Sequence, residues 1–266
     1  QGQPRWLIGP LVTISMICIG TSGSKGSSEN ILPSISCGTS QGLYICILLS
    51  AINISMPAIF AMTLFILIPC VPASRLVARL VERKKNTFTV QGASFVGIMI
   101  APWMIWLTNQ LMRDYLKQSI EVVVILSAIV TIYAMGEGIG RLACISFGCC
   151  YGKPVSALPP FFRKAFHHLY FVFYGSTKKI AYADGLEGMR ILPVQAITAV
   201  VFCATGITGV YLFLKGHYTA ASLGGVVVTQ TWRFASEFVR ADHRGGMRVT
   251  AYQIMGLLMI LYCFGV

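Results

Sequence analysis

The chain has 266 residues, of which 55% are hydrophobic and only 11% charged, and its mean hydropathy is +0.70. A soluble domain carries about 25% charged residues, so this composition excludes an ordinary soluble enzyme and favours a helical membrane protein. The formal net charge is +12. We expect the basic residues to interact with a membrane surface and an anionic lipid rather than with nucleic acid.

Long runs without charge mark the membrane helices. No Lys, Arg, Asp or Glu occurs in 43–70, 86–112, 191–214 or 249–266. A spanning helix needs about 20 apolar residues. Lipid offers no hydrogen-bond partner to backbone N–H and C=O groups, so the backbone must satisfy them within the helix. We therefore predict an all-α, polytopic membrane helix bundle, a single integral-membrane domain over residues 1–266. Its seven predicted spans are 6–21, 43–70, 93–111, 121–140, 191–214, 217–233 and 249–266.

The segments at and between these spans carry their own expectations. Arg5 followed by the apolar run 6–19 also fits a cleavable signal peptide. Residues 22–42 are rich in Ser and Gly and are predicted to be flexible. Residues 146–190 are predicted as an insertion between the fourth and fifth spans. Their aromatic and basic residues suit either an interfacial segment or a packed extramembrane subdomain.

The basic residues gather on one side of this topology. With seven spans, 17 of the 21 Lys and Arg residues share a face with the N-terminus. The other four are Lys25, Arg113, Lys117 and Lys215. Such a bias is typical of cytoplasmic loops, and it also suits a surface that attracts anionic lipid head groups.

The nine cysteines do not form a recognisable metal motif. The chain has no Cys-x-x-Cys pair and no His at zinc-ligand spacing. We therefore predict no metal site. Cys149 and Cys150 are adjacent, and the sequence leaves open whether they form a vicinal disulfide or two small buried thiols.

Arg141 is the first candidate functional residue. It ends an apolar stretch, and no charged residue follows it until Lys153. An arginine at membrane depth is costly and indicates function, and its fork of donors matches phosphate oxygens. The alternative is an internal ion pair, because Glu137 lies one helical turn before it.

Two further groups lie on the same predicted face. Arg233, Glu237 and Arg240 share one side of a helix, where the acid can orient either base or form a solvated network. At the start of the third span, Gln91 and Ser94 could donate hydrogen bonds to a ligand, although helix capping by Thr89 or Gln91 is an equal alternative.

These residues resemble those of a known family. Gly-Arg-x-x-Cys-x-x-x-Gly-Cys-Cys-Tyr-Gly-Lys-Pro at 140–154 is similar to the central signature of bacterial prolipoprotein diacylglyceryl transferases. Arg-Phe-x-x-Glu-Phe-x-Arg at 233–240 resembles a later element of that family. Weaker likenesses are Gly42-Leu43-Tyr44, Ser74-Arg75-Leu76 and Pro193-x-Gln195, so the resemblance runs in order from about residue 42 to 244.

The resemblance implies a multi-pass enzyme of the bacterial cell inner membrane. It would move the diacylglyceryl group of phosphatidylglycerol onto the lipobox cysteine of a prolipoprotein, bound through its signal peptide, without a cofactor. The active face would then point outward, against the positive-inside bias. The family's usual His-Gly-Gly is replaced here by Gln91-Gly92-Ala93, so the usual base is missing. Glu137, His243 and electrostatic activation of the substrate stay open as replacements. A related enzyme for another lipid or acceptor, a non-catalytic lipid-binding paralogue and a transporter remain alternatives.

The predicted site follows from these observations. The predicted catalytic residues are Arg141, Arg233, Glu237 and Arg240. The predicted substrate-binding residues are Arg75, Gln91, Gly92, Ser94, Glu137, Gly140, Cys144 and Tyr151.

Overall fold

The computed structural model describes residues 48–49, 54, 56–81, 90–111, 120–241 and 250–265. The predicted span 6–21 and the loop 22–42 lie outside these residues, as does the Gly42-Leu43-Tyr44 element.

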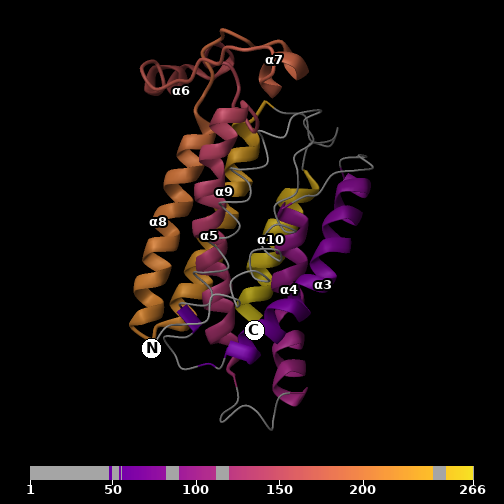
Figure 1. Ribbon diagram of the computed structural model, residues 1–266. Coiled ribbons are helices and arrows are strands. Elements are labelled where there is room, and N and C mark those ends of the chain that lie inside the picture. Colours follow the sequence, from indigo (N-terminus) through magenta and orange to yellow (C-terminus); the bar gives the residue numbers. More distant parts are fainter. Residues whose placement is uncertain are drawn as a thin grey trace, which may run out of the picture.

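Six long helices form the body of the described chain and run side by side in alternating directions (Figure 1). They are α3 (Met56–Val81), α4 (Val90–Leu111), α5 (Val122–Phe147), α8 (Val194–Leu214), α9 (Tyr218–Val239) and α10 (Ala251–Gly265). The described residues contain no β-strand, only isolated bridges. The all-α prediction is therefore confirmed for this part of the chain.

Four helices are long and apolar enough to cross a membrane, which is compatible with a membrane helix bundle. These stretches are Pro57–Val77, Gly92–Leu111, Val122–Phe147 and Val194–Leu214. The apolar helix α10 is shorter in its described part. Helix α9 has 22 residues but is not among the four, because its second half carries polar side chains, including Gln230, Arg233 and Glu237.

The predicted bounds of two spans are wrong. Within the span expected at 43–70, Leu48 and Leu49 are helical, Ile54 is not, and α3 runs from Met56 to Val81. Arg75 therefore lies on a helix and not in a loop. The helix expected to end at residue 140 continues to Phe147. The first charged residue marks the end of an apolar stretch, but a helix ends only where its backbone turns away. In α5 that point is Gly148, whose φ of 58° is easily adopted by glycine.

Helix α5 is the central helix, packed against α8, α9 and α4. Glycines allow the closest approach between α5 and α8. A Cβ atom on Gly138 would lie 2.6 Å from the Sγ of Cys203, and one on Gly209 would lie 2.6 Å from the Oγ1 of Thr131. This contact fixes the rotation of α5 about its axis, and with it the direction in which the polar face of α5 points.

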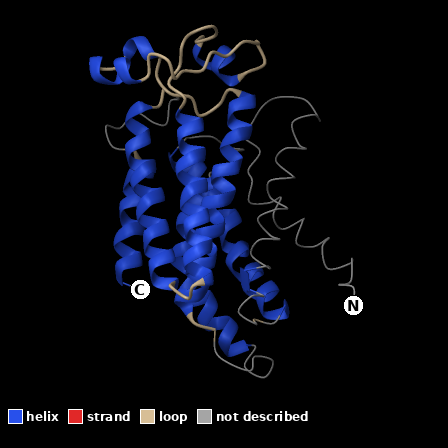
Figure 2. Ribbon diagram, turned by 90° about the vertical axis from the view of Figure 1, so that its left-hand side faces the viewer, coloured by secondary structure: helices blue, strands red, loops and turns tan. Residues whose placement is uncertain are grey.

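The segment between α5 and α8 covers one end of the bundle (Figures 1 and 2). It contains a 3₁₀ turn (Val155–Ala157), α6 (Pro160–Ala165) and α7 (Lys179–Asp184). Its small apolar core is formed by Tyr151, Phe173, Ile180 and Ile191. The backbone bridge between Gly152 and Arg240, together with a 2.9 Å hydrogen bond from Lys153 N to Val239 O, joins this segment to the end of α9.

Candidate functional site

A single carboxylate links two helices at the centre of the candidate site. Glu137 lies on α5, and Nη2 of Arg141, one helical turn later, donates a hydrogen bond to its Oε1. Nη2 of Arg233, on α9, lies 2.9 Å from the same oxygen and forms a second ion pair. The structure therefore confirms the ion pair that the spacing of Glu137 and Arg141 indicated, and adds a cation from a distant helix.

The three charges are largely removed from solvent. The side chains of Arg141 and Glu137 are 14% and 10% exposed, and that of Arg233 is 12% exposed. Two guanidinium groups meet one carboxylate, and buried charges are costly unless they are paired and hydrogen-bonded. Among the described residues, the buried Nε of Arg141 has no hydrogen-bond partner. The cluster thus keeps a donor for a further group.

Aromatic rings support the cation that α9 contributes. The Cζ atom of Arg233 lies 5.6 Å from the centroid of the Tyr133 ring and 5.7 Å from that of Phe202. The ring faces attract a guanidinium and partly replace its lost hydration. Ser94, on α4, lies beside the Tyr133 hydroxyl. Side chains from α4, α5, α8 and α9 therefore meet here.

The start of α4 brings part of the third predicted group to this place. Ser94 reaches the cluster through Tyr133. Gly92 is buried in the first turn of α4, whereas the side chain of Gln91 lies outside the described part of the structure. Gly140 is half-buried directly before Arg141 on α5.

Three cysteine thiols gather at the end of α5, which the sequence did not predict. The Sγ atoms of Cys144, Cys149 and Cys150 all lie within 4.8 Å of one another. Hydrogen bonds from the Cys144 and Cys149 thiols, with the positive charges of Arg240 and Arg141, hold the pKa of Cys150 well below its usual value, against the opposing effect of burial. The group is next to the ion-pair cluster, because Arg141 also acts electrostatically on Cys144.

Arg240 and Glu237 occupy the end of α9. Arg240 is the residue that ends this helix, and its charge acts on Cys150. The sequence left open whether Glu237 orients Arg233 or Arg240 or belongs to a solvated network, and the structure adds an ion pair between Arg233 and Glu137. Glu237 is half-buried one turn before Arg240. The three predicted arginines therefore surround one region, with Arg141 and Arg233 on Glu137 and Arg240 at the thiols.

Two predicted substrate-binding residues lie elsewhere. Arg75 is exposed on α3, a helix that packs mainly against α4, and it takes no part in the ion pairs around Glu137. Tyr151 is fully buried in the core of the segment after α5, where its hydroxyl donates a hydrogen bond to Asp184. The structure thus gives Tyr151 a place in packing, away from any surface that a substrate can reach.

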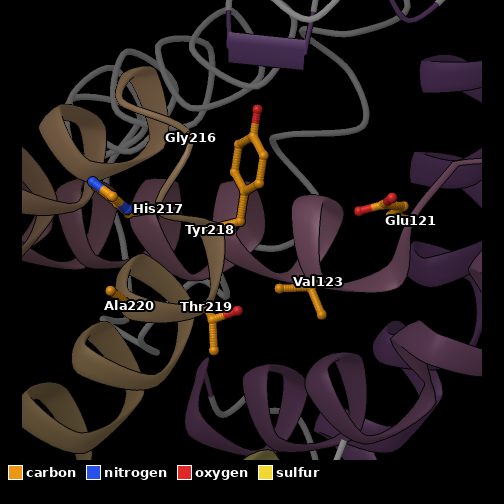
Figure 3. Close-up of a pocket in the computed structure, with 7 residues that line it drawn as sticks. All are labelled: Glu121, Val123, Gly216, His217, Tyr218, Thr219 and Ala220. Carbon is orange, nitrogen blue, oxygen red and sulfur yellow. The ribbon is translucent and has the colours of Figure 1, made fainter.

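A pocket of about 440 Å³ lies at the opposite end of the bundle. Figure 3 shows its lining side chains, which include Glu121 at the start of α5 and His217, Tyr218 and Thr219 at the start of α9. None of the described residues that line it is a Lys or Arg. The pocket is separated from Arg141 by most of the length of α5.

The candidate site is consequently a buried cationic cluster beside a group of thiols, both at the end of the bundle where α5 and α9 finish. Such an arrangement can hold a singly charged anion next to sulfur chemistry. No family model, curated protein or solved structure matches this chain.

Proposed function

We propose that this chain is a membrane enzyme that transfers the diacylglyceryl group of phosphatidylglycerol to the lipobox cysteine thiol of a prolipoprotein. The observation that carries the proposal is the meeting of Arg141 and Arg233, from two different helices, on the single carboxylate of Glu137. The resemblance of residues 140–154 and 233–240 to the transferase family supplies the reaction.

The charge of the cluster supports an anionic phospholipid as substrate. A phosphodiester carries one negative charge, and two guanidinium groups from different helices lie together at Glu137. The buried Nε of Arg141, which has no partner among the described residues, offers a donor to a phosphate oxygen. A zwitterionic lipid would bring its own cation into the same space, so phosphatidylglycerol suits the cluster better than phosphatidylcholine.

The chemistry requires a thiolate and a stabilised leaving group. The acceptor sulfur attacks the glyceryl carbon bonded to the phosphate oxygen, the carbon–oxygen bond breaks, and glycerol phosphate leaves with the electron pair. Negative charge grows on the departing phosphate, and fixed guanidinium donors stabilise charge that develops in a transition state. Arg141 and Arg233 are the residues placed for that role.

In this proposal the chain crosses the bacterial inner membrane seven times. The segment between α5 and α8 then lies outside the membrane or at its interface. The ends of α3, α5 and α9 and the start of α4, α8 and α10 share its side (Figure 1). Most basic residues belong to this side, where they attract the head groups of anionic lipids.

Reconstitution tests the proposal. The full chain is placed in phosphatidylglycerol vesicles with a peptide that contains a lipobox, and the products are measured by mass spectrometry. We expect a thioether-linked diacylglyceryl peptide and free glycerol phosphate. Arg141→Gln should lower the turnover by about 100–1,000-fold, which is the usual effect of removing one hydrogen-bond donor to the negative charge that develops in a transition state.

Lys164→Gln is the matched control, because Lys164 is an exposed base on α6 at the same end of the bundle. Its turnover should equal that of the wild type. The proposal fails if wild-type protein forms neither product. The assignment of the phosphate to Arg141 fails if Arg141→Gln and Lys164→Gln behave alike.

A further inference from the structure

The three thiols at the end of α5 form a group that the ion-pair cluster does not explain. Cys144 lies within the last turn of α5, and Cys149 and Cys150 follow Gly148, where the chain reverses. Their Sγ atoms lie within 4.8 Å of one another. Structural cysteines in a membrane protein pack as separate small apolar residues, so three converging sulfur atoms require another explanation.

The backbone that presents these thiols is held in place. Cys149 N donates a 3.1 Å hydrogen bond to Cys144 O, and Nε2 of the buried Gln195 donates a 2.9 Å hydrogen bond to Cys149 O. Cys150 has a φ of 56°, which is unfavourable for a residue with a side chain. A strained residue that tertiary contacts maintain is a signal of function, and here the strain directs a thiol toward two others.

The spacing of the sulfur atoms suits a tetrahedral thiophilic ion. Zinc–sulfur bonds of about 2.3 Å place tetrahedral sulfur ligands about 3.8 Å apart. The widest separation here, 4.8 Å at most, therefore needs to shrink by roughly 1 Å, which side-chain rotation can supply. Three protein ligands with one open position are typical of catalytic zinc, whereas structural zinc has four.

The charges around the thiols are those that a thiolate complex needs. Three thiolates and one Zn²⁺ carry a net charge of −1, which is costly in an apolar interior without a counterion. Arg141 and Arg240 both act electrostatically on Cys150. A guanidinium can thus compensate the complex without becoming a ligand, because arginine has no lone pair to give.

We propose that Cys144, Cys149 and Cys150 bind one Zn²⁺ ion whose fourth coordination position takes the thiol of the acceptor substrate. The identity of that acceptor rests on the proposed function, whereas the metal site itself rests on the three cysteines alone. Among the described residues, no histidine belongs to this cluster, and the carboxylate of Glu137 is occupied by two arginines. In this proposal the zinc supplies the activation of the thiol.

The step balances without an oxidant or a further reactant. As the acceptor sulfur binds zinc, its S–H bond breaks and the proton passes to water, since a coordinated thiol is deprotonated. A sulfur electron pair then forms the bond to the glyceryl carbon. The carbon–oxygen bond breaks toward the phosphate, and the neutral thioether, a weak ligand, leaves the zinc.

Cobalt substitution tests the site independently of turnover. The full chain is purified in detergent, treated with a chelator and titrated with Co²⁺, which gives an intense near-ultraviolet absorption when thiolates coordinate it. We expect one Co²⁺ per chain, displaced by Zn²⁺. Because the loss of supporting groups around a metal weakens affinity by about 10–100-fold, Cys144→Ala and Cys149→Ala, which remove ligands, should weaken it by at least about 100-fold.

Two further variants exclude a trivial loss of structure. Cys150→Gly removes a thiol while relieving the positive φ, so it should fold at least as well as the wild type and still lose the cobalt absorption. Cys263→Ala removes a buried cysteine on α10, outside the cluster, and should bind cobalt normally. A cobalt absorption that survives in Cys150→Gly, or that is absent from the wild type, overturns the proposal. So does a thiol titration that finds a Cys149–Cys150 disulfide in the native protein.

The acceptor peptide separates this inference from the proposed function. A lipobox peptide should increase the thiolate-to-cobalt absorption, and the same peptide with Ser in place of Cys should not; equal responses overturn the open fourth position. Metal binding without any diacylglyceryl transfer refutes the proposed function and leaves the three-cysteine site standing. Transfer that is unaffected by the chelator and by Cys150→Gly refutes the zinc and leaves the proposed function standing.

Discussion

Glu137→Gln is the sharpest test of the electrostatic cluster. The substitution keeps the size of the side chain and one oxygen acceptor but removes the charge that Arg141 and Arg233 share. Two buried cations then face each other without the carboxylate between them. Removing one partner of a buried ion pair costs about 3–5 kcal/mol. The residual exposure of 10–14% and the aromatic rings beside Arg233 favour the lower end of that range.

The loss is measured as a change in Tm from tryptophan fluorescence of the detergent-solubilised chain. About 3 kcal/mol corresponds to a fall in Tm of roughly 6–12 °C for a domain near this size. Glu121→Gln is the control, since Glu121 is an exposed acid at the start of the same helix and its loss should change the unfolding free energy by less than about 1 kcal/mol.

Anionic lipid should reverse part of this effect. Without the negative charge of Glu137 the variant cluster attracts a phosphodiester more strongly than the wild-type cluster does, so phosphatidylglycerol should narrow the difference in Tm while phosphatidylcholine leaves it unchanged. If Glu137→Gln and Glu121→Gln melt alike, the three charges do not form a buried unit. If both lipids act equally on the Glu137 variant, the cluster does not select for a phosphodiester.

Three further predictions concern stability. Gly138→Ala should lower the unfolding free energy by about 1–3 kcal/mol, because the added carbon would lie 2.6 Å from the Sγ of Cys203 on α8. Gly224→Ala, with no heavy atom within 4 Å of the added carbon, should instead raise the unfolding free energy by up to about 1 kcal/mol. Thermal unfolding of the two variants checks this difference. Tyr151→Phe should cost about 1–3 kcal/mol by removing the hydrogen bond to Asp184, with proteolysis confined to the segment after α5; unchanged proteolysis would contradict the structural place of that hydroxyl. Cys150→Gly should raise the unfolding free energy of the metal-free chain by about 1 kcal/mol, and a decrease would show that its backbone is not strained.

The sequence was sufficient for the six long helices, though not for the bounds of α3 and α5, and for half of the cluster. Apolar runs located those six helices, and the spacing of Glu137 and Arg141 indicated their ion pair. The partner of Arg233 could not be found in this way, because the nearest carboxylate on its own helix is Glu237, whereas Glu137 reaches it only through the packing of α5 against α9. Helical periodicity shows which side chains on one helix can form an ion pair, but it contains no information about which helices pack together.

The thiol cluster was missed for a different reason. A search for Cys-x-x-Cys pairs and for histidines at zinc spacing rejects the positions of Cys144, Cys149 and Cys150. The turn at Gly148 brings them together, since its left-handed backbone ends α5 and folds the next residues back toward the last helical turn. Glycine after an apolar helix is a recognised sign of such a reversal, so three cysteines on both sides of Gly148 were the available signal.

The arrangement of α5 explains why an anion site and a thiol site lie together. Tyr133, Glu137, Arg141 and Cys144 follow one another at intervals of four, four and three residues, and this spacing places them along one face of a helix. A phosphate held by Arg141 therefore lies about one helical turn, roughly 5 Å along the axis, from the first cysteine. Group transfer requires that separation to be short and fixed. In the proposed function, one rigid helix carries Arg141 and Cys144, so the separation of these two residues depends on the helix itself, and the turn at Gly148 brings Cys149 and Cys150 to the same place.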